Sequence, residues 1–352
     1  MAKISHSKIT IDLVAKTPYR GSGPRGVDVY ARNLYNNLSS ILGHSKVTLS
    51  HDQGTSHGSS ITHYTFFDPF FLTLWGKTHA SKFIVTVHDL IPLVFPTHFK
   101  AGLRGRLKWL LQRHTLRGSS AIITDSLCSK KDIARLTGIE SSKIYVVPLS
   151  GGHGVTTERL VKVVRKEYKL PDKYLLYVGD INWNKNVPGL IQAFSEIDSD
   201  IHLVLVGKAF VSSTETPEYQ TIKQAITQSG KSERIHILGF IPSHHLLAIY
   251  RGAHLYVQPS WYEGFGFPVL EALEQGTPVA CASTGSLPEV GGDHVHYFDP
   301  SDRRSFVKVL SNLLSDDSLR SRYIESGKKW AHSFSWEKVV KETHAIYEKV
   351  LD

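Results

Sequence analysis

The chain has 352 residues, of which 41% are hydrophobic and 21% charged, and these values fit two globular domains with ordinary apolar cores. No window approaches the roughly 18 consecutive apolar residues of a membrane-spanning helix, and no apolar run follows Lys3, so we expect no secretory signal and a cytoplasmic location. The two cysteines, Cys128 and Cys281, lie far apart, which argues against a disulfide scaffold or a cysteine-rich zinc site. A net charge of +9 leaves nucleic acid, an anionic membrane surface and phosphate-bearing substrates open as partners.

The first half of the chain alternates short apolar strands with helices. Apolar residues recur at helical spacing between Val27 and Leu42, and Gly43 is expected to end this helix. The expected strands are 9–14, 83–87, 121–124 and 144–148. A glycine-rich break at 151–154 and a basic stretch up to Pro171 predict the linker.

A second series of the same kind follows the linker. Its expected strands are 174–179, 201–207, 235–239, 255–257 and 278–282, and the last 50 residues are expected to be helical. Strands that alternate with helices predict right-handed βαβ units and parallel sheets. We therefore predict an α/β protein with two doubly wound, Rossmann-like domains at 1–155 and 156–334. Ligands of such sheets bind beyond the carboxyl ends of the strands, which makes a cleft between the domains the expected site.

Two glutamates frame a glycine loop at one of these strand ends. Glu263 precedes a Gly-x-Gly loop, and Glu271 is expected in the first turn of a helix that begins at Pro268 and stops at Gly276. A helix N-terminus with exposed N–H groups binds anions such as a diphosphate. Carboxylates accept hydrogen bonds from sugar hydroxyls, so one glutamate can hold a ribose and the other a transferred sugar. The alternative is that both glutamates only complement a helix dipole.

The segment 263–272, Glu-Gly-Phe-Gly-Phe-Pro-Val-Leu-Glu-Ala, resembles the signature of retaining GT-B glycosyltransferases of family 4. The segments 238–241, 248–253, 276–279 and 286–290 are also similar to that family. The resemblance covers most of the chain and is weakest across 44–80. It implies a GT-B fold of two Rossmann-like domains facing a cleft, with a UDP- or GDP-sugar bound by the second. It also implies that a final helix at 335–352 returns to the first domain.

The same resemblance implies roles for individual residues. Glu271 would bind the ribose hydroxyls and Glu263 the donor sugar. The backbone N–H groups of the glycine loop, at Gly264, Phe265 and Gly266, would bind the diphosphate and the sugar. A second segment, Gly239, Phe240 and Ile241, would line the base of the nucleotide.

A cation is needed where the leaving diphosphate develops negative charge. Lys185 lies in the segment that begins at Gly179, which is similar to the phosphate-binding segment of the family. The family often carries an arginine where this chain has Asn184 or Asp180, so the second cation is open, and Lys208 after the next strand is one substitute.

On the acceptor side, His88 and Asp89 directly follow the strand at 83–87. Val-His-Asp-Leu resembles a motif of a mannosyltransferase-B-like subgroup, whose histidine lies at the sugar. His88 would therefore hydrogen-bond the transferred sugar or orient the acceptor. The alternative is a purely structural imidazole.

A Gly-x-Gly-x-x-Gly pattern at 21–26 opens the first helix. Dinucleotide binding requires the first glycine to end the strand, and here about five residues intervene, so an NAD-dependent oxidoreductase is a distant alternative. The loop and helix start are instead expected beside the acceptor or sugar, through Arg25, Gly26, Val27 and Tyr30.

The segment 100–117 is basic and amphipathic and contains Trp109. It predicts either a core-facing helix with a solvated basic face or a helix that contacts an anionic membrane, which would suit a lipid-linked acceptor. Asp198-Ser199-Asp200 is expected to be a turn, and His51, His57 and His63 a polar loop. We therefore expect no metal, and no nucleic-acid motif accompanies the net charge.

Together these features and the resemblance predict a metal-independent hexosyltransferase that moves a sugar from a UDP- or GDP-sugar to a saccharide or lipid-linked saccharide in polysaccharide biosynthesis. Retention of the anomeric configuration is implied by the family resemblance alone. A front-face route, in which the leaving phosphate takes the acceptor's proton, fits the lack of an obvious base. A non-catalytic protein that binds a nucleotide sugar or saccharide is the second interpretation.

Overall fold

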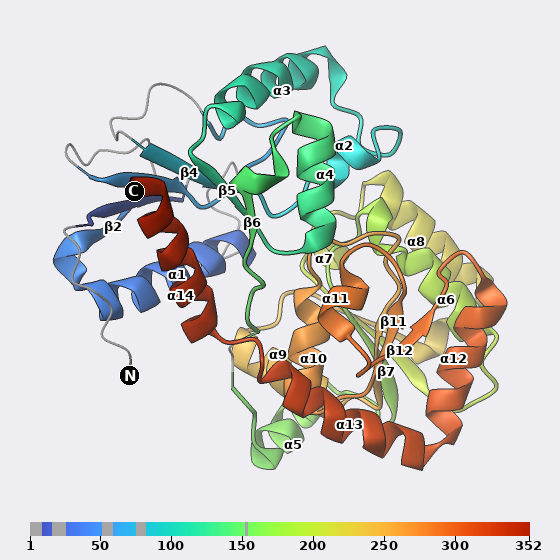
Figure 1. The fold of residues 1–352 in the computed structure, drawn as a ribbon. Coiled ribbons are helices and arrows are strands. Elements are labelled where there is room, and N and C mark those ends of the chain that lie inside the picture. The colour runs from blue at the N-terminus through green and yellow to red at the C-terminus, as the bar shows by residue number, and fades with distance from the viewer. Residues whose placement is uncertain (1–8, 16–25, 51–58, 75–81, 152–153) are drawn as a thin grey trace. The chain divides into compact units, whose positions relative to one another are not determined.

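The computed structural model describes residues 9–15, 26–50, 59–74, 82–151 and 154–352. The chain divides into two compact units (Figure 1), called here the first unit, Met1–Leu149 with Ser335–Asp352, and the second unit, Ser150–Phe334. Each unit contains a six-stranded sheet whose strand pairs are parallel. In the described part of the chain, no helix has both the length and the apolarity to cross a membrane.

The sheet of the first unit has the order β2-β1-β3-β4-β5-β6. Its strands are β1 (Ile11–Val14), β2 (Val47–Ser50), β3 (Ile61–Tyr64), β4 (Lys82–Thr86), β5 (Ala121–Thr124) and β6 (Ile144–Val146). Its helices are α1 (Gly26–Leu42), α2 (Ile91–Val94), α3 (Gly102–Arg117), α4 (Leu127–Thr137) and α14 (Trp336–Leu351). The last helix of the chain therefore belongs to the first unit, where it packs against α1 and β5.

Alternation along the strands divides the core of the first unit into two layers. On one face, Val85 and Ile122 pack with Leu116 of α3 and Ile133 of α4. The other face carries polar side chains that are buried but satisfied. His63 accepts or donates hydrogen bonds at both ring nitrogens, 2.7 Å from the Tyr347 hydroxyl and 2.7 Å from the Thr86 hydroxyl. Burial lowers the pKa of His63 to about 3, so this imidazole is neutral.

The second unit has the order β12-β11-β10-β7-β8-β9. Its strands are β7 (Tyr174–Val178), β8 (His202–Val206), β9 (Ile235–Leu238), β10 (Leu255–Gln258), β11 (Val279–Ala282) and β12 (His296–Phe298). Its helices are α5 (Glu158–Glu167), α6 (Val187–Ser195), α7 (Ala209–Ser212), α8 (Pro217–Gln228), α9 (Ser243–Gly252), α10 (Phe267–Gln275), α11 (Leu287–Gly291), α12 (Arg303–Ser315) and α13 (Asp317–Ala331).

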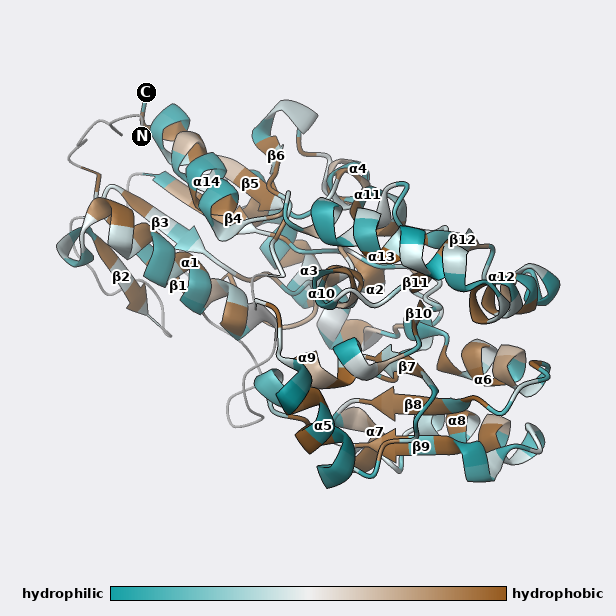
Figure 2. Cartoon of the chain, turned by 90° about the horizontal axis from the view of Figure 1, so that it is seen from below, coloured by the Kyte–Doolittle hydropathy of each residue, from teal (hydrophilic) through white to brown (hydrophobic). Residues whose placement is uncertain are grey.

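Two groups of helices cover this second sheet. Helices α8, α6 and α12 contact one another in that order, as do α5, α9, α10 and α13, and the two series join where α12 contacts α13 (Figure 1). The strands β7, β8, β10 and β11 are almost fully buried, whereas the edge strand β9 is only partly buried. In Figure 2, strand β8 is mostly hydrophobic. Continuous apolar strands are typical of a parallel sheet with both faces covered.

The expected α/β class with two doubly wound parallel sheets is confirmed, but two expectations about elements were wrong. The two compact units meet after Leu149, while the sequence placed a domain boundary at 155. The stretch predicted as a linker contains α5, because Val161 and Val164 bury one face of a helix that Thr157 caps. His63 lies in a buried strand, not in a polar loop. His51, His57 and the glycine loop at 21–25 lie outside the described residues.

Candidate functional site

In the second unit, β7 and β10 are neighbours in the middle of the sheet, and the strand order reverses between them. The strands that follow β7 in the chain lie toward one edge of the sheet, and those that follow β10 lie toward the other. At such a point the loops after the two strands diverge and leave room for a ligand beyond their carboxyl ends. The loop after β7 carries Lys185 in a short 3-10 turn, and the loop after β10 carries Glu263. Residues 78 positions apart in sequence are thus brought together at this edge of the sheet.

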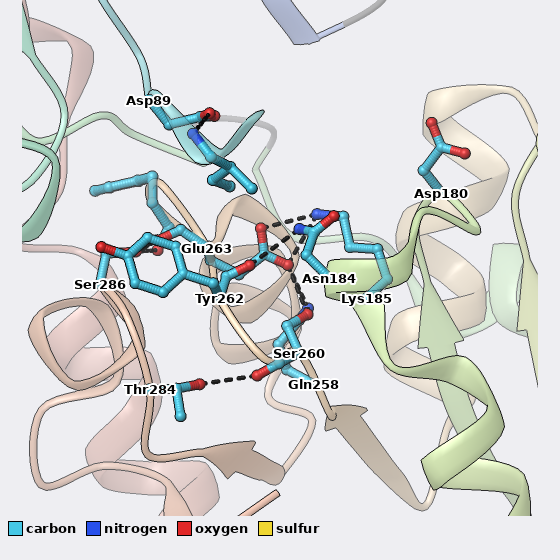
Figure 3. Close-up of polar contacts among 12 residues, drawn as sticks. Asp89, Asp180, Asn184, Lys185, Gln258, Ser260, Tyr262, Glu263, Thr284 and Ser286 are labelled. Carbon is cyan, nitrogen blue, oxygen red and sulfur yellow. Dashed lines mark hydrogen bonds and ion pairs between the residues drawn. The ribbon is translucent and has the colours of Figure 1, made fainter. Parts of the chain in front are cut away.

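Lys185 and Glu263 form a bidentate ion pair (Figure 3). The Lys185 Nζ atom lies 2.8 Å from each carboxylate oxygen of Glu263. The Oε1 atom also accepts hydrogen bonds from the Gln258 side-chain amide at 2.9 Å and the Ser260 hydroxyl at 2.7 Å. Glu263 is buried, with 7% of the residue exposed, and these donors compensate the desolvation of its charge. The side chain of Lys185 remains 22% exposed, so its ammonium group can reach a ligand.

Hydrogen bonds to the backbone hold this loop in one conformation. The Asn184 side-chain amide donates to the Tyr262 carbonyl at 3.0 Å, which ties the loop after β7 to the loop after β10. The Ser286 hydroxyl lies 2.9 Å from the Glu263 carbonyl and 2.7 Å from the Phe265 carbonyl. Gly285, at φ +58°, packs so closely that a Cβ atom there would lie 2.9 Å from both the N and O atoms of Glu263. The position of the carboxylate is therefore set by three separate segments.

Helix α10 begins beside the ion pair with no side-chain cap. Its N-cap is Gly266 at φ +113°, a conformation that favours glycine, and Gly276 ends the helix at φ +74°. Pro268 is the second helical residue, one later than expected. Glu271 was expected in the first turn but lies one turn further in, where it accepts a 2.8 Å hydrogen bond from the buried Tyr250 hydroxyl. The uncapped N-terminus of α10 is a partly positive site that suits an anion.

The other residues predicted for the donor lie at the same edge of the second sheet. Gly179 directly follows β7, and Gly239, Phe240 and Ile241 follow β9. Ile241 is buried, whereas Phe240 is 63% exposed, so its ring is available for stacking on a base. Asp180 accepts a hydrogen bond from the backbone N–H of the residue that follows it, and Lys208, next to α7, is exposed.

In the first unit, His88 and Asp125 meet at the carboxyl ends of the neighbouring strands β4 and β5. The His88 Nδ1 atom lies 2.7 Å from Oδ2 of Asp125. Within the described residues, the Nε2 atom of His88 is buried without a hydrogen-bond partner. The ring also meets Tyr30 edge-on, with 5.0 Å between the ring centroids. The imidazole is thus oriented by Asp125 and Tyr30, with Nε2 left for another group.

Burial and charge act in opposite directions on His88. Burial alone lowers the pKa of its imidazole. The negative charge and hydrogen bond of Asp125, with smaller contributions from Asp89 and the Thr65 backbone, outweigh this effect and raise the pKa above its ordinary value. The pKa of Asp125 is itself raised, because its burial exceeds the stabilisation that His88 supplies. The pair therefore favours a proton on His88 more strongly than solvent does.

The remaining residues predicted for the acceptor side are placed as follows. Tyr30 is buried, with its hydroxyl 3.2 Å from that of Thr86, so it supports the ring of His88 from within the core. Asp89 accepts a hydrogen bond from the Ile91 backbone and starts α2. Gly26 begins α1, the side chain of Val27 is not described, and Arg25 lies outside the described residues.

Three polar partners in these sites were not predicted from the sequence: Asp125, Gln258 and Ser260. Asp125 directly follows the buried strand β5, and His88 lies two residues after the end of β4. This position at a strand end is the sequence signal by which Asp125 could have been found. Gln258 is a polar residue at the end of an otherwise apolar strand, which also marks it. Asp198–Asp200 forms an exposed connection before β8, as expected for a turn. No group of three metal-ligating side chains occurs among the residues that the structure describes.

Comparison with protein families gives two adjoining matches. The model described as "Glycosyltransferase Family 4" matches residues 55–159, and the model described as "Glycosyl transferases group 1" matches residues 162–330. Together they match parts of both units, including the segments that carry His88, Lys185 and Glu263.

Two curated relatives share the sequence pattern. O-antigen chain mannosyltransferase B of Escherichia coli is 30% identical over 272 residues, which cover 76% of this chain and 70% of that protein. The serotype-specific mannosyltransferase WbdA of Escherichia coli is 25% identical over 264 residues, which cover 72% of this chain but 32% of WbdA. The chain thus spans about a third of the length of this second relative.

A solved structure shows the same fold. Anabaena HepE, in complex with UDP and glucose, superposes with a TM-score of 0.77 at 15% identity and covers 97% of this chain and 100% of its own. The GT-B architecture expected for the two parallel sheets is confirmed by this likeness.

Proposed function

The chain belongs to glycosyltransferase family 4, and from this premise we propose that it transfers a hexose from a UDP- or GDP-sugar to a saccharide acceptor in polysaccharide biosynthesis. The names of the two curated relatives favour mannose as the transferred hexose. The UDP and glucose in the HepE complex support a nucleoside diphosphate as the leaving group. An acceptor linked to lipid belongs to the same proposal.

One observation carries this proposal: the Lys185–Glu263 ion pair beside the uncapped N-terminus of α10. A cation and a helix N-terminus together suit a diphosphate, and a fixed carboxylate suits the hydroxyls of a sugar. The leaving diphosphate gains negative charge as its bond to the sugar breaks, and Lys185 stabilises that charge without a metal. Lys208 is the candidate for a second cation.

The remaining roles follow the same division. Glu271 binds the ribose hydroxyls, Phe240 stacks on the base and Glu263 holds the sugar through its carboxylate. His88 hydrogen-bonds the sugar or orients the acceptor through Nε2. All polar atoms of the Glu263 side chain already have partners, so it is a poor nucleophile. We therefore favour a front-face route: the sugar–phosphate bond breaks, the acceptor oxygen bonds on the same face, and its proton passes to the leaving phosphate.

Thermal unfolding with UDP, GDP, ADP and NAD, each with and without EDTA, tests the donor site. A nucleotide at 100 times its dissociation constant stabilises the folded state by about 2.7 kcal/mol, a shift of several degrees in the unfolding temperature. We expect such a shift with UDP or GDP that persists in EDTA. The Lys185→Gln variant should lose it, while Lys173→Gln, which removes an exposed lysine of the same unit, should keep it.

Transfer itself is measured by release of the nucleoside diphosphate from UDP- and GDP-hexoses when saccharide acceptors are added. We expect release only with an acceptor present and a product with the donor's anomeric configuration, read by NMR. Binding without turnover on any donor would instead indicate a non-catalytic binding protein. Stabilisation by NAD alone would overturn the proposal, and an inverted product would exclude the front-face route.

A further inference from the structure

Helix α3 is fixed to the first unit by one face. The buried positions Gly105, Gln112 and Leu116, with the half-buried Trp109, follow one another at helical spacing. The Gln112 side-chain oxygen accepts hydrogen bonds from the Thr73 N–H at 2.7 Å and its hydroxyl at 3.0 Å. Trp109 packs against the core of the unit. The rotation of α3 about its own axis is therefore defined, and so is the face that it turns outward.

The outward face of α3 carries a second apolar stripe. Leu103, Leu107, Leu110 and Leu111 follow the spacing i, i+4, i+7 and i+8, which places them on the side of the helix opposite to the buried positions. They are exposed to 86%, 60%, 58% and 50%. A surface helix normally carries polar residues on this side, so four exposed leucines in one stripe indicate a contact surface. We call these four residues the leucine stripe.

Positive charge borders the leucine stripe on both sides. Residues 100–117 contain six lysines and arginines and no aspartate or glutamate, so they account for six of the nine net positive charges of the chain. Arg104 lies to one side of the stripe and Arg106 to the other, and both are exposed, as is Lys100. Arg113 and Arg117 instead donate to the Thr137 carbonyl at 3.2 and 2.7 Å and hold α4.

We propose that α3 docks on the surface of a bilayer that contains anionic lipids. The leucine stripe enters the boundary between headgroups and acyl chains, and the flanking cations contact lipid phosphates; apolar residues bordered by lysine and arginine are typical of helices in this position. A second copy of the chain does not fit, because two such surfaces repel each other. Nucleic acid explains the cations but not the four exposed leucines.

Sedimentation of the full-length protein with phosphatidylcholine vesicles, with and without phosphatidylglycerol, tests this docking. We expect binding to the anionic vesicles that weakens with salt and little binding to the neutral ones. The triple variant Lys100→Glu, Arg104→Glu, Arg106→Glu should bind at least about tenfold more weakly, since each cation near an anionic surface contributes separately. Leu107→Ser with Leu110→Ser should also weaken binding, although the charge is unchanged.

A charge-matched control separates this surface from net charge alone. Arg159→Glu, Lys162→Glu, Lys166→Glu changes three exposed cations of α5 in the second unit and alters the total charge by the same amount. This variant should bind vesicles nearly as well as the native protein. Equal losses in the two triple variants, or equal binding to neutral and anionic vesicles, would overturn the proposal. Unfolding temperatures within a degree or so of the native value would show that the exposed substitutions leave the fold intact.

Discussion

Asp125 is the carboxylate that acts most strongly on the protonation of the His88 imidazole, with a smaller contribution from Asp89. The ring is held by Asp125 at 2.7 Å, while burial of the same ring opposes the charged form. Because the two effects act in opposite directions, removing the carboxylate of Asp125 should lower the pKa of the ring. The charge on Asp125 therefore favours the protonated ring, in which Nε2, the atom proposed to meet the sugar or acceptor, donates a hydrogen bond.

The variant Asp125→Asn should lower the pKa of His88, because only Asp89 and the Thr65 backbone then oppose the effect of burial on the ring. NMR titration of labelled histidine measures this, with His88→Gln assigning the signal among the 19 histidines. The acid limb of kcat/KM should move to lower pH if His88 acts in its neutral form. Asp132→Asn, which removes a carboxylate paired with Arg135 in the same unit, should change neither. An unchanged pKa in Asp125→Asn would show that the carboxylate does not control the ring.

The places of the candidate site residues could be predicted where their position along the chain carried the signal, while their chemical roles stay predictions. Lys185, Glu263 and His88 each follow an apolar strand, and the residues that follow parallel strands lie at the same edge of their own sheet. Their partners Asp125 and Gln258 could not be assigned, because which strand ends are neighbours depends on the strand order, and the order is set by packing across the whole sheet. The pairing of Lys185 with Glu263 was likewise not predicted.

At the scale of elements, glycines decide how closely two loops approach. Gly285 has φ +58°, and a Cβ atom there would lie 2.9 Å from two backbone atoms of Glu263. Backbone atoms cannot move aside as a flexible side chain can, so the loop that carries Glu263 would have to shift. Gly230 has a similar φ of +65°, but a Cβ atom there would meet no described atom within 4 Å. Both glycines therefore have a left-handed backbone conformation, but only Gly285 has neighbouring atoms that a Cβ atom would meet.

Gly285→Ala and Gly230→Ala should each destabilise the protein by about 1 kcal/mol through the left-handed backbone alone. Only Gly285→Ala should also weaken nucleotide binding, because it displaces the carboxylate that pairs with Lys185. Denaturant unfolding measures the first effect, and the shift in unfolding temperature with UDP or GDP the second. Equal nucleotide binding by the two variants would show that the Glu263 loop tolerates displacement.

Elements with strong periodicity were predicted, and short polar ones were not. The long apolar strands β7 and β8 and the helix α1 appear close to their expected ranges. The strand β3, with the sequence Ile-Thr-His-Tyr, was missed because half of its residues are polar, yet all four are buried. The hydrogen-bond partners of His63 lie on other elements, and the four residues of β3 contain no signal that predicts these partners.

At the scale of the whole molecule, the two units differ in how the chain builds them. The second unit is one continuous segment, Ser150–Phe334, whereas the first needs Ser335–Asp352 to return to it. Helix α14 contributes the buried apolar side chains of Val339, Val340, Ile346, Tyr347 and Val350 to the first unit. The Tyr347 hydroxyl also bonds His63 inside the sheet. The first unit is therefore completed only by the last residues of the chain.

Ending the chain at Phe334 should unfold the first unit and leave the second intact. Each buried apolar side chain lost from α14 contributes about 1.5–3 kcal/mol, so the loss is on the order of 10 kcal/mol. A typical domain is stable by about 5–15 kcal/mol, and neutral His63 would lose one of its two partners as well.

Hydrogen exchange should show β4 and β5 unprotected and β7 and β8 still protected, with UDP or GDP still bound. The control Lys338→Ala, Lys341→Ala alters only the exposed face of α14 and should leave exchange unchanged. Full protection of β4 and β5 in the shortened chain would mean that the first unit holds together without its last helix.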